Sequence, residues 1–303
     1  MMATPKTKLA EALWAGRGVL TAECCPPAAW DSDVVQAAVA PLPESLDAIV
    51  VADNPDGVRG SALATAAVLA AAGREPILTM TTRDRNRIAL ESDVLGAACL
   101  GVGGILCVSG DHQSLGVCPE AAGAYDIDSI QFSLAVRRMV AEGLSFDGRE
   151  LDAAPKFLLC AVVQPYLRPM GLNMIRFRKK ITAGARVVFT QAVFDVAGFK
   201  EWLGVVDQAG IGEHASIIAS VLPLTGAAEA RQLQARGTYG PVGDEVIARI
   251  EGASDPAAEG VAICAEVAAE LKGLESLAGI HILCGGCEGT AAKVIEQAGL
   301  TAA

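Results

Sequence analysis

Eight short runs of β-branched and aliphatic residues alternate with longer segments rich in Ala and Leu, and this alternation constrains the fold more than any other feature of the chain. Runs of this kind, separated by helical patterns, indicate repeated βα units. The expected strands are residues 19–22, 48–52, 77–81, 105–109, 157–163, 187–190, 216–221 and 280–283. We therefore predict an α/β protein, a (β/α)8 TIM barrel that forms a single domain over residues 1–303.

Helices are expected between the strands, at residues 32–39, 60–72, 87–100, 130–142, 174–183, 198–208 and 227–235. The last crossover is longer and contains two extra predicted helices, 243–250 and 256–274, an insertion that barrels tolerate. An open doubly wound sheet is the main alternative, but its phosphate fingerprint is absent, because the glycine cluster at 101–104 precedes a strand. The charge-free stretch 94–110 is interpreted as a helix end, a turn and a buried strand.

The composition agrees with this architecture and excludes some partners. The chain is 52% hydrophobic but only 4% aromatic, which favours a core of small aliphatic side chains between helices and strands. A net charge of −11 makes nucleic acid an unfavourable partner. Early charges at Lys6, Lys8 and Glu11 predict a cytoplasmic protein without membrane insertion. The nine cysteines are expected to be free thiols or ligands, most of them buried.

Candidate functional residues are sought where strands end, because the C-terminal ends of barrel strands carry the chemistry. Glu23 ends the first strand among apolar and thiol neighbours, Cys24 and Cys25. Such surroundings raise a carboxyl pKa and suit a general acid. The alternative is a carboxylate that forms a salt bridge with an arginine at the barrel mouth.

The fourth and sixth strands also end in polar residues. In the run Ser109-Gly110-Asp111, the glycine permits close approach of a ligand ring, and the aspartate either stabilises a developing cation or caps the next segment. Gln191 either hydrogen-bonds a heterocycle or is a buried structural amide.

Two basic runs remain ambiguous. Within residues 176–180, Arg176 and Lys180 share one helix face and either bind a phosphate or remain solvated. Residues 83–87 are either a charge-paired helix start or a rim that holds an anionic substrate tail.

Together these segments resemble one family in order and spacing. Glu23 with its following prolines, and residues 81–87, 96–98, 109–111, 179–185, 189–195 and 221–224, resemble successive motifs of the methylenetetrahydrofolate reductases. The resemblance covers roughly residues 18–299. It implies a reductase that uses a flavin, FAD or FMN, to convert 5,10-methylenetetrahydrofolate into 5-methyltetrahydrofolate, or the reverse, through an iminium intermediate and hydride transfer.

The resemblance also implies roles for individual residues. Glu23 matches the general acid, Asp111 the aspartate beside flavin and folate, and Gln191 the residue that binds the pterin ring. The implied flavin-binding residues are Thr79, Ser109, Gly110, Asp111, Tyr125, Asp126, Gln164, Asn173, Arg176, Lys179 and Lys180.

The sequence departs from the family pattern at several places. Asn173 replaces a common Asp and Thr79 a common His, so the choice between FAD and FMN stays open. Residues 283–287 read Leu-Cys-Gly-Gly-Cys, unlike relatives that use a nicotinamide. The chain therefore resembles the branch of anaerobic one-carbon metabolism, in which a partner subunit with metal centres supplies electrons in place of NAD(P)H.

Three alternatives are kept. Cys284 and Cys287 can approach Cys24 and Cys25 in a closed barrel, as a four-thiol metal site or as unliganded thiols at the mouth. The chain can instead be a pterin-handling barrel methyltransferase without flavin. It can also be a noncatalytic scaffold subunit of an electron-transfer complex.

Overall fold

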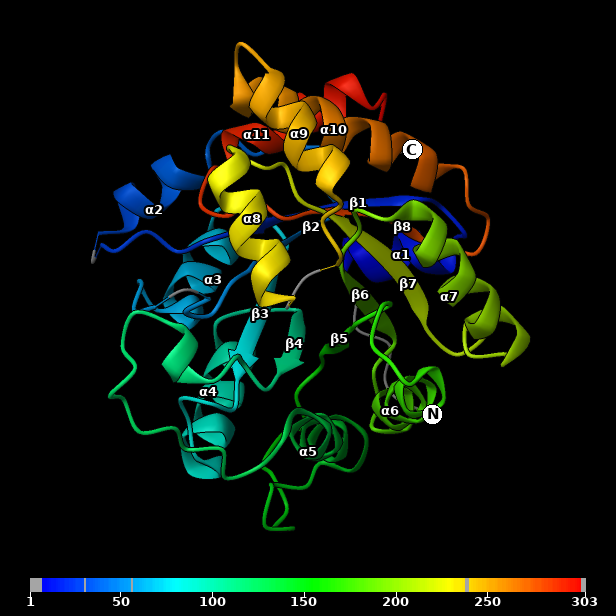
Figure 1. Cartoon of the computed structure of the whole chain (residues 1–303). Helices are drawn as coiled ribbons and strands as arrows, with labels where there is room; N and C mark the ends of the chain where they lie inside the picture. Colours follow the sequence, from blue (N-terminus) through cyan, green and yellow to red (C-terminus); the bar gives the residue numbers. More distant parts are fainter. Residues whose placement is uncertain (1–6, 30, 56, 238–239, 301–303) are drawn as a thin grey trace.

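The computed structural model describes residues 7–29, 31–55, 57–237 and 240–300, and it is a closed barrel of eight parallel strands in sequential order (Figure 1). β1 pairs with β8, which closes the sheet. All eight predicted strands are confirmed, as β1 (Val19–Cys24), β2 (Ala48–Val51), β3 (Pro76–Thr81), β4 (Gly104–Val108), β5 (Leu158–Val163), β6 (Val187–Ala192), β7 (Ser216–Val221) and β8 (Gly279–Ile282). The doubly wound alternative is therefore wrong.

The predicted helices are confirmed as well, including both extra helices of the last crossover. They are α2 (Ser32–Val39), α3 (Ala62–Ala71), α4 (Arg87–Cys99), α5 (Ser129–Glu142), α6 (Met170–Thr182), α7 (Val196–Gln208), α8 (Ala227–Arg236), α9 (Asp244–Gly252) and α10 (Pro256–Lys272). α6 begins before the predicted residue 174, directly after Pro169, which has no N–H to leave unpaired at a helix start. Three elements were not predicted: α1 (Lys8–Trp14), the 3₁₀ turn η1 (Gln113–Leu115) and α11 (Gly289–Gln297).

The strands are buried on both faces, as expected for a parallel sheet covered by helices. Side chains that point outward pack against the surrounding helices. Side chains that point inward, such as Val50, Leu106 and Phe189, form a separate cluster that also contains Leu9 of α1. α1 therefore packs against the interior of the barrel, and the opposite end is left for a ligand.

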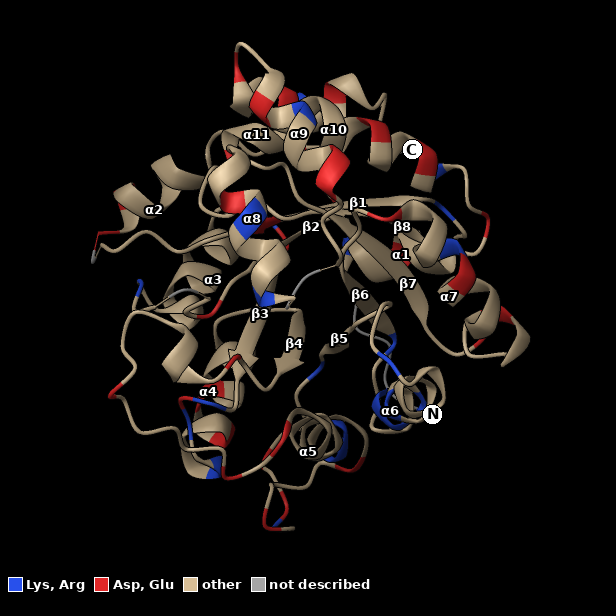
Figure 2. Cartoon of the chain, viewed as in Figure 1, with Lys and Arg blue, Asp and Glu red and all other residues tan. Residues whose placement is uncertain are grey.

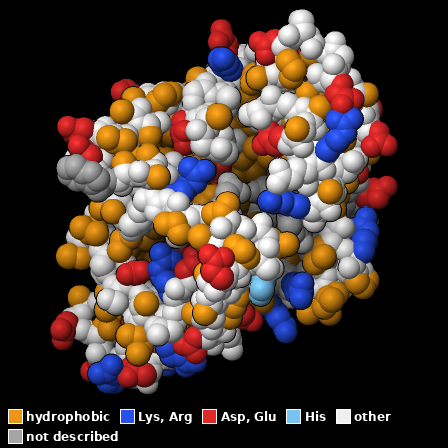
Figure 3. All heavy atoms as spheres, turned by 60° about the vertical axis from the view of Figure 1, so that its left-hand side comes forward, with side chains coloured by type: hydrophobic (Ala, Val, Ile, Leu, Met, Phe, Trp, Pro, Cys, Tyr) orange, Lys and Arg blue, Asp and Glu red, His pale blue; other side chains and the backbone are white. Residues whose placement is uncertain are grey.

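The cysteines, the helices and the surface charges can be compared with the predictions from composition. All nine cysteines are free, and six are buried. In the described parts of the chain, no helix has the length and hydropathy needed to cross a membrane. On the face presented in Figure 3, the described Lys and Arg side chains are interspersed with Asp and Glu and form no continuous basic surface.

Candidate functional site

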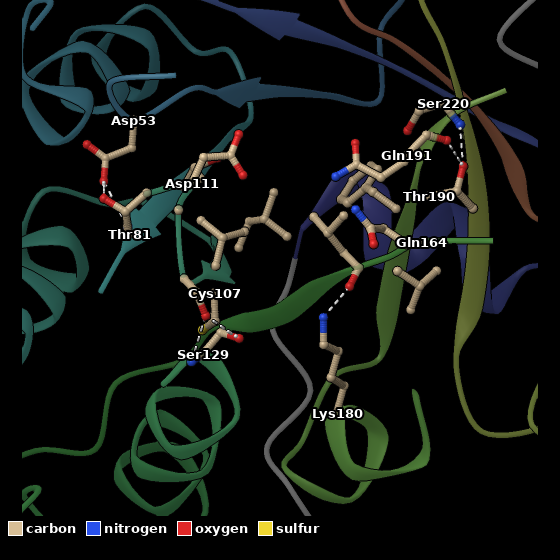
Figure 4. A pocket seen from close by; sticks show the side chains of 18 of the residues that line it. Asp53, Thr81, Cys107, Asp111, Ser129, Gln164, Lys180, Thr190, Gln191 and Ser220 are labelled. Atoms are coloured by element: carbon tan, nitrogen blue, oxygen red, sulfur yellow. Dashed lines mark hydrogen bonds between the residues drawn. The ribbon is translucent and has the colours of Figure 1, made fainter. Parts of the chain in front are cut away.

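A cavity of about 580 Å³ opens at the C-terminal ends of the strands. This is the end of a β/α barrel where ligands bind, and the volume is typical of small-molecule sites. Figure 4 shows Asp111 on one side of this space and Gln164 and Gln191 on another. The predicted site residues that line it are Glu23, Thr79, Ser109, Gly110, Asp111, Gln164, Asn173, Arg176, Lys180 and Gln191.

Three predicted cofactor residues lie outside the cavity lining. The hydroxyl of Tyr125 donates to the backbone oxygen of Asp111 at 3.3 Å, so this ring lies beside the rim. Asp126 forms an ion pair with Arg87 at 2.8 Å, and Lys179 is exposed on α6. These residues can contact only a ligand that extends over the rim.

Glu23 lies at the end of β1 with its carboxylate turned toward the extension of β8. Its Oε2 accepts the backbone N–H of Cys284 at 3.2 Å and of Gly285 at 3.1 Å. Burial raises the pKa of Glu23, and the two backbone hydrogen bonds oppose this shift. Within the described residues no Lys or Arg pairs with Glu23, so the salt-bridge alternative is wrong.

The four cysteines near β1 and β8 do not form a metal cluster. Among the residues that the structure describes, no group of three or more His, Cys, Asp or Glu side chains is placed to hold a metal ion. Burial raises the pKa of Cys24 to about 12, as expected for a structural thiol in apolar surroundings. Cys24, Cys25 and Cys284 are buried, whereas Cys287 is exposed.

The turn after β4 is held by its neighbours. Gly110 has a φ of +77°, and a β-carbon there would lie 3.2 Å from Cβ of Arg83. The same arginine donates to the backbone oxygen of Asp111 at 3.2 Å. In the described part of the chain the carboxylate of Asp111 accepts no backbone N–H, so the capping alternative is wrong and its charge is free to face a ligand.

The basic run at residues 83–87 is the charge-paired helix start. Arg83 pairs with Asp84 at 2.7 Å, and Arg87 pairs with Asp126. Arg85 binds Asp53 at 2.6 Å, and Asp53 also accepts the N–H and hydroxyl of Thr81. Asp53 was not singled out by sequence because its partner comes from a different strand end.

The basic residues of α6 lie on different faces of the helix, and only one of these faces lines the cavity. Arg176 and Lys180 line the cavity, whereas the exposed Arg178 and Lys179 lie outside its lining. Nζ of Lys180 donates to the backbone oxygen of Val162 (Figure 4), and burial lowers its pKa to about 8. Figure 2 shows the concentration of positive charge on α6 in a chain that is acidic overall. This face can hold an anionic group.

Other predicted residues have structural partners as well. The amide of Asn173 donates to the backbone oxygen of Gln164 at 2.7 Å, which links the start of α6 to the end of β5. The hydroxyl of Ser109 donates to that of Ser129 at 3.1 Å. No side-chain hydrogen bond of Gln191 occurs among the described residues, and its half-buried amide points into the cavity (Figure 4).

Two residues inside the barrel were missed by sequence. His281 of β8 is buried, and its Nδ1 lies 2.9 Å from the hydroxyl of Thr21. Ser220 of β7 also lines the cavity, and its buried hydroxyl has no partner in the described structure. An inward position on a strand is the only sequence signal that either residue carries.

Burial lowers the pKa of His281 to about 3, so the free energy of unfolding should depend on pH. The unfolded chain takes up a proton near pH 6.5 that the folded imidazole refuses, so stability falls as pH drops below 6.5. From pH 7 to pH 5 we expect this histidine to cost about 2 kcal/mol of unfolding free energy. Urea unfolding of His281→Gln should show a correspondingly flatter acid limb.

The exposed His214 provides the matched control. His214→Gln is expected to keep the pH dependence of the parent protein. Identical acid limbs for His281→Gln and the parent would contradict the assigned ionisation of His281.

A closed barrel with an acid, an aspartate and an amide around one cavity at its C-terminal mouth is an architecture suited to chemistry on a small molecule. A family model described as methylenetetrahydrofolate reductase matches residues 15–299. The chain therefore belongs to the methylenetetrahydrofolate reductase family, which supports an oxidoreductase of folate metabolism. The comparison with curated proteins finds no match.

The comparison with solved structures finds matches at low sequence identity. An uncharacterized protein from Clostridium thermocellum that binds two copies of 5-methyl-5,6,7,8-tetrahydrofolic acid matches with a TM-score of 0.67 and 14% identity, over 97% of this chain and 100% of that chain. Tryptophan synthase from Mycobacterium tuberculosis matches with a TM-score of 0.49 and 13% identity, over 98% of this chain and 99% of that chain. A 2,3-dimethylmalate lyase reaches a TM-score of 0.49 at 13% identity, over 96% of this chain and 85% of that chain.

Proposed function

We propose that this protein is a flavin-dependent reductase that interconverts 5,10-methylenetetrahydrofolate and 5-methyltetrahydrofolate. The observation that carries the proposal is the convergence of Glu23, Asp111 and Gln191, from three different strand ends, on one cavity. Family membership supports the reaction. The folate bound by the Clostridium thermocellum protein supports a folate as the ligand.

Each of the three residues has a role that its surroundings suit. Glu23 donates a proton to a folate nitrogen, because a buried carboxyl with a raised pKa keeps its proton nearer neutral pH. This protonation opens the methylene bridge to an iminium cation. The negative charge of Asp111 stabilises the cation, and Gln191 hydrogen-bonds the pterin ring.

The cavity has groups that fit a flavin. Arg176 and Lys180 offer positive charge to a phosphate, and the unpartnered hydroxyl of Ser220 offers a hydrogen bond to a polar ring edge. When bound, the flavin supplies the hydride chemistry that side chains lack. The protein's contribution is to bind, orient and exclude water. The proposed flavin is FAD or FMN.

The proposed electron donor is a partner subunit with metal centres, in preference to NAD(P)H. The Leu-Cys-Gly-Gly-Cys segment that follows β8 supports this donor, because it differs from the pattern of nicotinamide-using relatives. Flavin reconstitution separates this function from the two competing ones, a methyltransferase without flavin and a noncatalytic scaffold.

The purified protein, reconstituted with FAD or FMN, is expected to show flavin absorbance bands that bleach on anaerobic reduction and return when methylenetetrahydrofolate is added. Lys180→Met should weaken flavin binding by about 10- to 100-fold, because a charge-assisted hydrogen bond is lost. Fluorescence titration of the flavin measures this change without any turnover.

Arg178→Met is the matched control, since Arg178 lies on the same helix, is exposed and donates to the backbone oxygen of Ala209 at 3.2 Å. We expect it to leave flavin affinity unchanged. A protein that gains no flavin would reject the proposal in favour of the methyltransferase. Bound flavin that folate does not reoxidise would favour the scaffold.

A further inference from the structure

Two glutamates connect the ends of the neighbouring strands β1 and β8 in opposite directions. Glu23, on β1, accepts the N–H groups of Cys284 and Gly285, which follow β8, at 3.2 and 3.1 Å. Glu288, which directly precedes α11, accepts the N–H of Cys25, which follows β1, at 2.9 Å. Each carboxylate therefore binds backbone donors on the extension of the other strand, and we call this pair the glutamate clasp.

The sequence of the β8 extension explains why its N–H groups reach Glu23. Gly285 and Gly286 have φ values of +56° and +88°, in the left-handed region that favours glycine. The N–H of Cys287 donates to the oxygen of Cys284 at 2.8 Å, which closes a tight turn. The Cys-Gly-Gly-Cys run is thus accounted for by a turn that presents donors to a carboxylate.

Burial makes the clasp electrostatically significant. Glu288 is only 7% exposed, and no Lys or Arg forms an ion pair with it among the described residues. Burial is the largest cause that raises the pKa of Glu23, hydrogen bonds oppose it, and the negative charge of Glu288 is a smaller cause that raises the pKa further. Charges interact strongly where water is excluded, so a second carboxylate disfavours ionisation of the first.

The other titratable groups around the clasp do not cancel this effect. Burial, helped by the two carboxylates, raises the pKa of the neighbouring thiols, so they stay neutral. The nearby cation is Arg59, from the loop before α3, whose guanidinium would lie 3.9 Å from a β-carbon at Gly286 and acts on Cys25. The titratable groups that interact with Glu23 are therefore Glu288, Cys24, Cys25 and Cys284, whereas Arg59 acts on Cys25.

We infer that Glu288 is a positioning residue for Glu23: its hydrogen bond to the N–H of Cys25 anchors the segment after β1 and places a second carboxylate beside the Glu23 carboxyl at the cavity. The inference rests on the proposed function, in which Glu23 donates a proton to folate. Glu288 lies outside the cavity lining and acts only through Glu23.

Glu288→Gln tests the charge separately from the hydrogen bond, because the amide oxygen still accepts the N–H of Cys25. We expect the apparent pKa of Glu23 to fall toward its ordinary value. Flavin reoxidation by methylenetetrahydrofolate should then be unchanged at acidic pH and about 10-fold slower on the alkaline limb, where protonated Glu23 limits the rate. Equal loss at every pH would show a merely structural role and overturn the inference.

A second readout needs neither folate nor flavin. Carbon-13 NMR of glutamate-labelled protein, with the Glu23 signal assigned by its loss in Glu23→Gln, follows the ionisation directly. We expect Glu288→Gln to lower the pKa of Glu23. Glu296 is an exposed glutamate on α11, and Glu296→Gln should leave the pKa of Glu23 unchanged. Titration of Glu23 at its ordinary value in the parent protein would overturn the inference without any variant. Absence of folate turnover in the parent would overturn the proposed function, while the NMR titration still decides the role of Glu288.

Discussion

Replacing Glu23 by Gln is expected to slow folate turnover by about 10²- to 10⁴-fold, the usual contribution of a general acid. The amide oxygen can still accept the N–H groups of Cys284 and Gly285, so the β8 extension should keep its position. The amide cannot act as a general acid, because it does not release a proton at neutral pH. Stopped-flow mixing of the reduced, flavin-loaded protein with methylenetetrahydrofolate measures the effect as the rate of flavin reoxidation.

Two controls separate lost chemistry from lost structure in this variant. Flavin affinity and the rate of flavin reduction by dithionite are expected to match those of the parent protein, because neither step uses the Glu23 proton. Unchanged folate turnover in Glu23→Gln would contradict the assignment of Glu23 as the acid. Loss of flavin affinity would indicate instead that Glu23 supports the cofactor site.

Replacing Asp53 by Ala is expected to lower the free energy of unfolding by about 3–5 kcal/mol, because it breaks a buried ion pair from one side. The Asp53 side chain is 1% exposed and binds Arg85 through both carboxylate oxygens. It also accepts the N–H and hydroxyl of Thr81, so the ends of β2 and β3 lose a shared anchor. Urea unfolding of the cofactor-free protein, followed by fluorescence of the buried Trp202, measures the loss.

Asp93→Asn is the matched control, because Asp93 binds the same guanidinium. Its side chain is 33% exposed and lies 2.9 Å from Nε of Arg85. An ion pair that water reaches is worth less than about 1 kcal/mol, so this variant should be nearly as stable as the parent. Equal losses in Asp53→Ala and Asp93→Asn would contradict the view that burial makes the Asp53 pair dominant.

The strand and helix pattern was predictable because burial repeats locally along the chain. Parallel strands covered on both faces read as continuous aliphatic runs, and amphipathic helices follow each of them. α1 was missed because it has seven residues and gains its stability by packing Leu9 against the barrel interior. That contact involves residues distant in sequence, which local periodicity does not reveal.

The candidate site was predictable to the extent that it depends on strand ends. Glu23, Asp111 and Gln191 were singled out because each follows a run that reads as a strand, and closure of the barrel brings them around one cavity. Tyr125 and Asp126 were predicted through family resemblance, and the structure places both outside the lining. Their positions depend on the long segment after β4, whose path has no repeating pattern.

The sequence by itself determined the barrel, the order of its strands and the presence of an acid, an aspartate and an amide at the strand ends, because these follow from local periodicity and from the common direction of parallel strands. Only the tertiary structure decided which charged groups neutralise one another. Closure of the sheet pairs Arg85 with Asp53 and leaves Glu23 beside Glu288, held by backbone N–H groups instead of a cation. The physical reason is that ion pairing and desolvation depend on separation in space, which spacing along a chain does not specify.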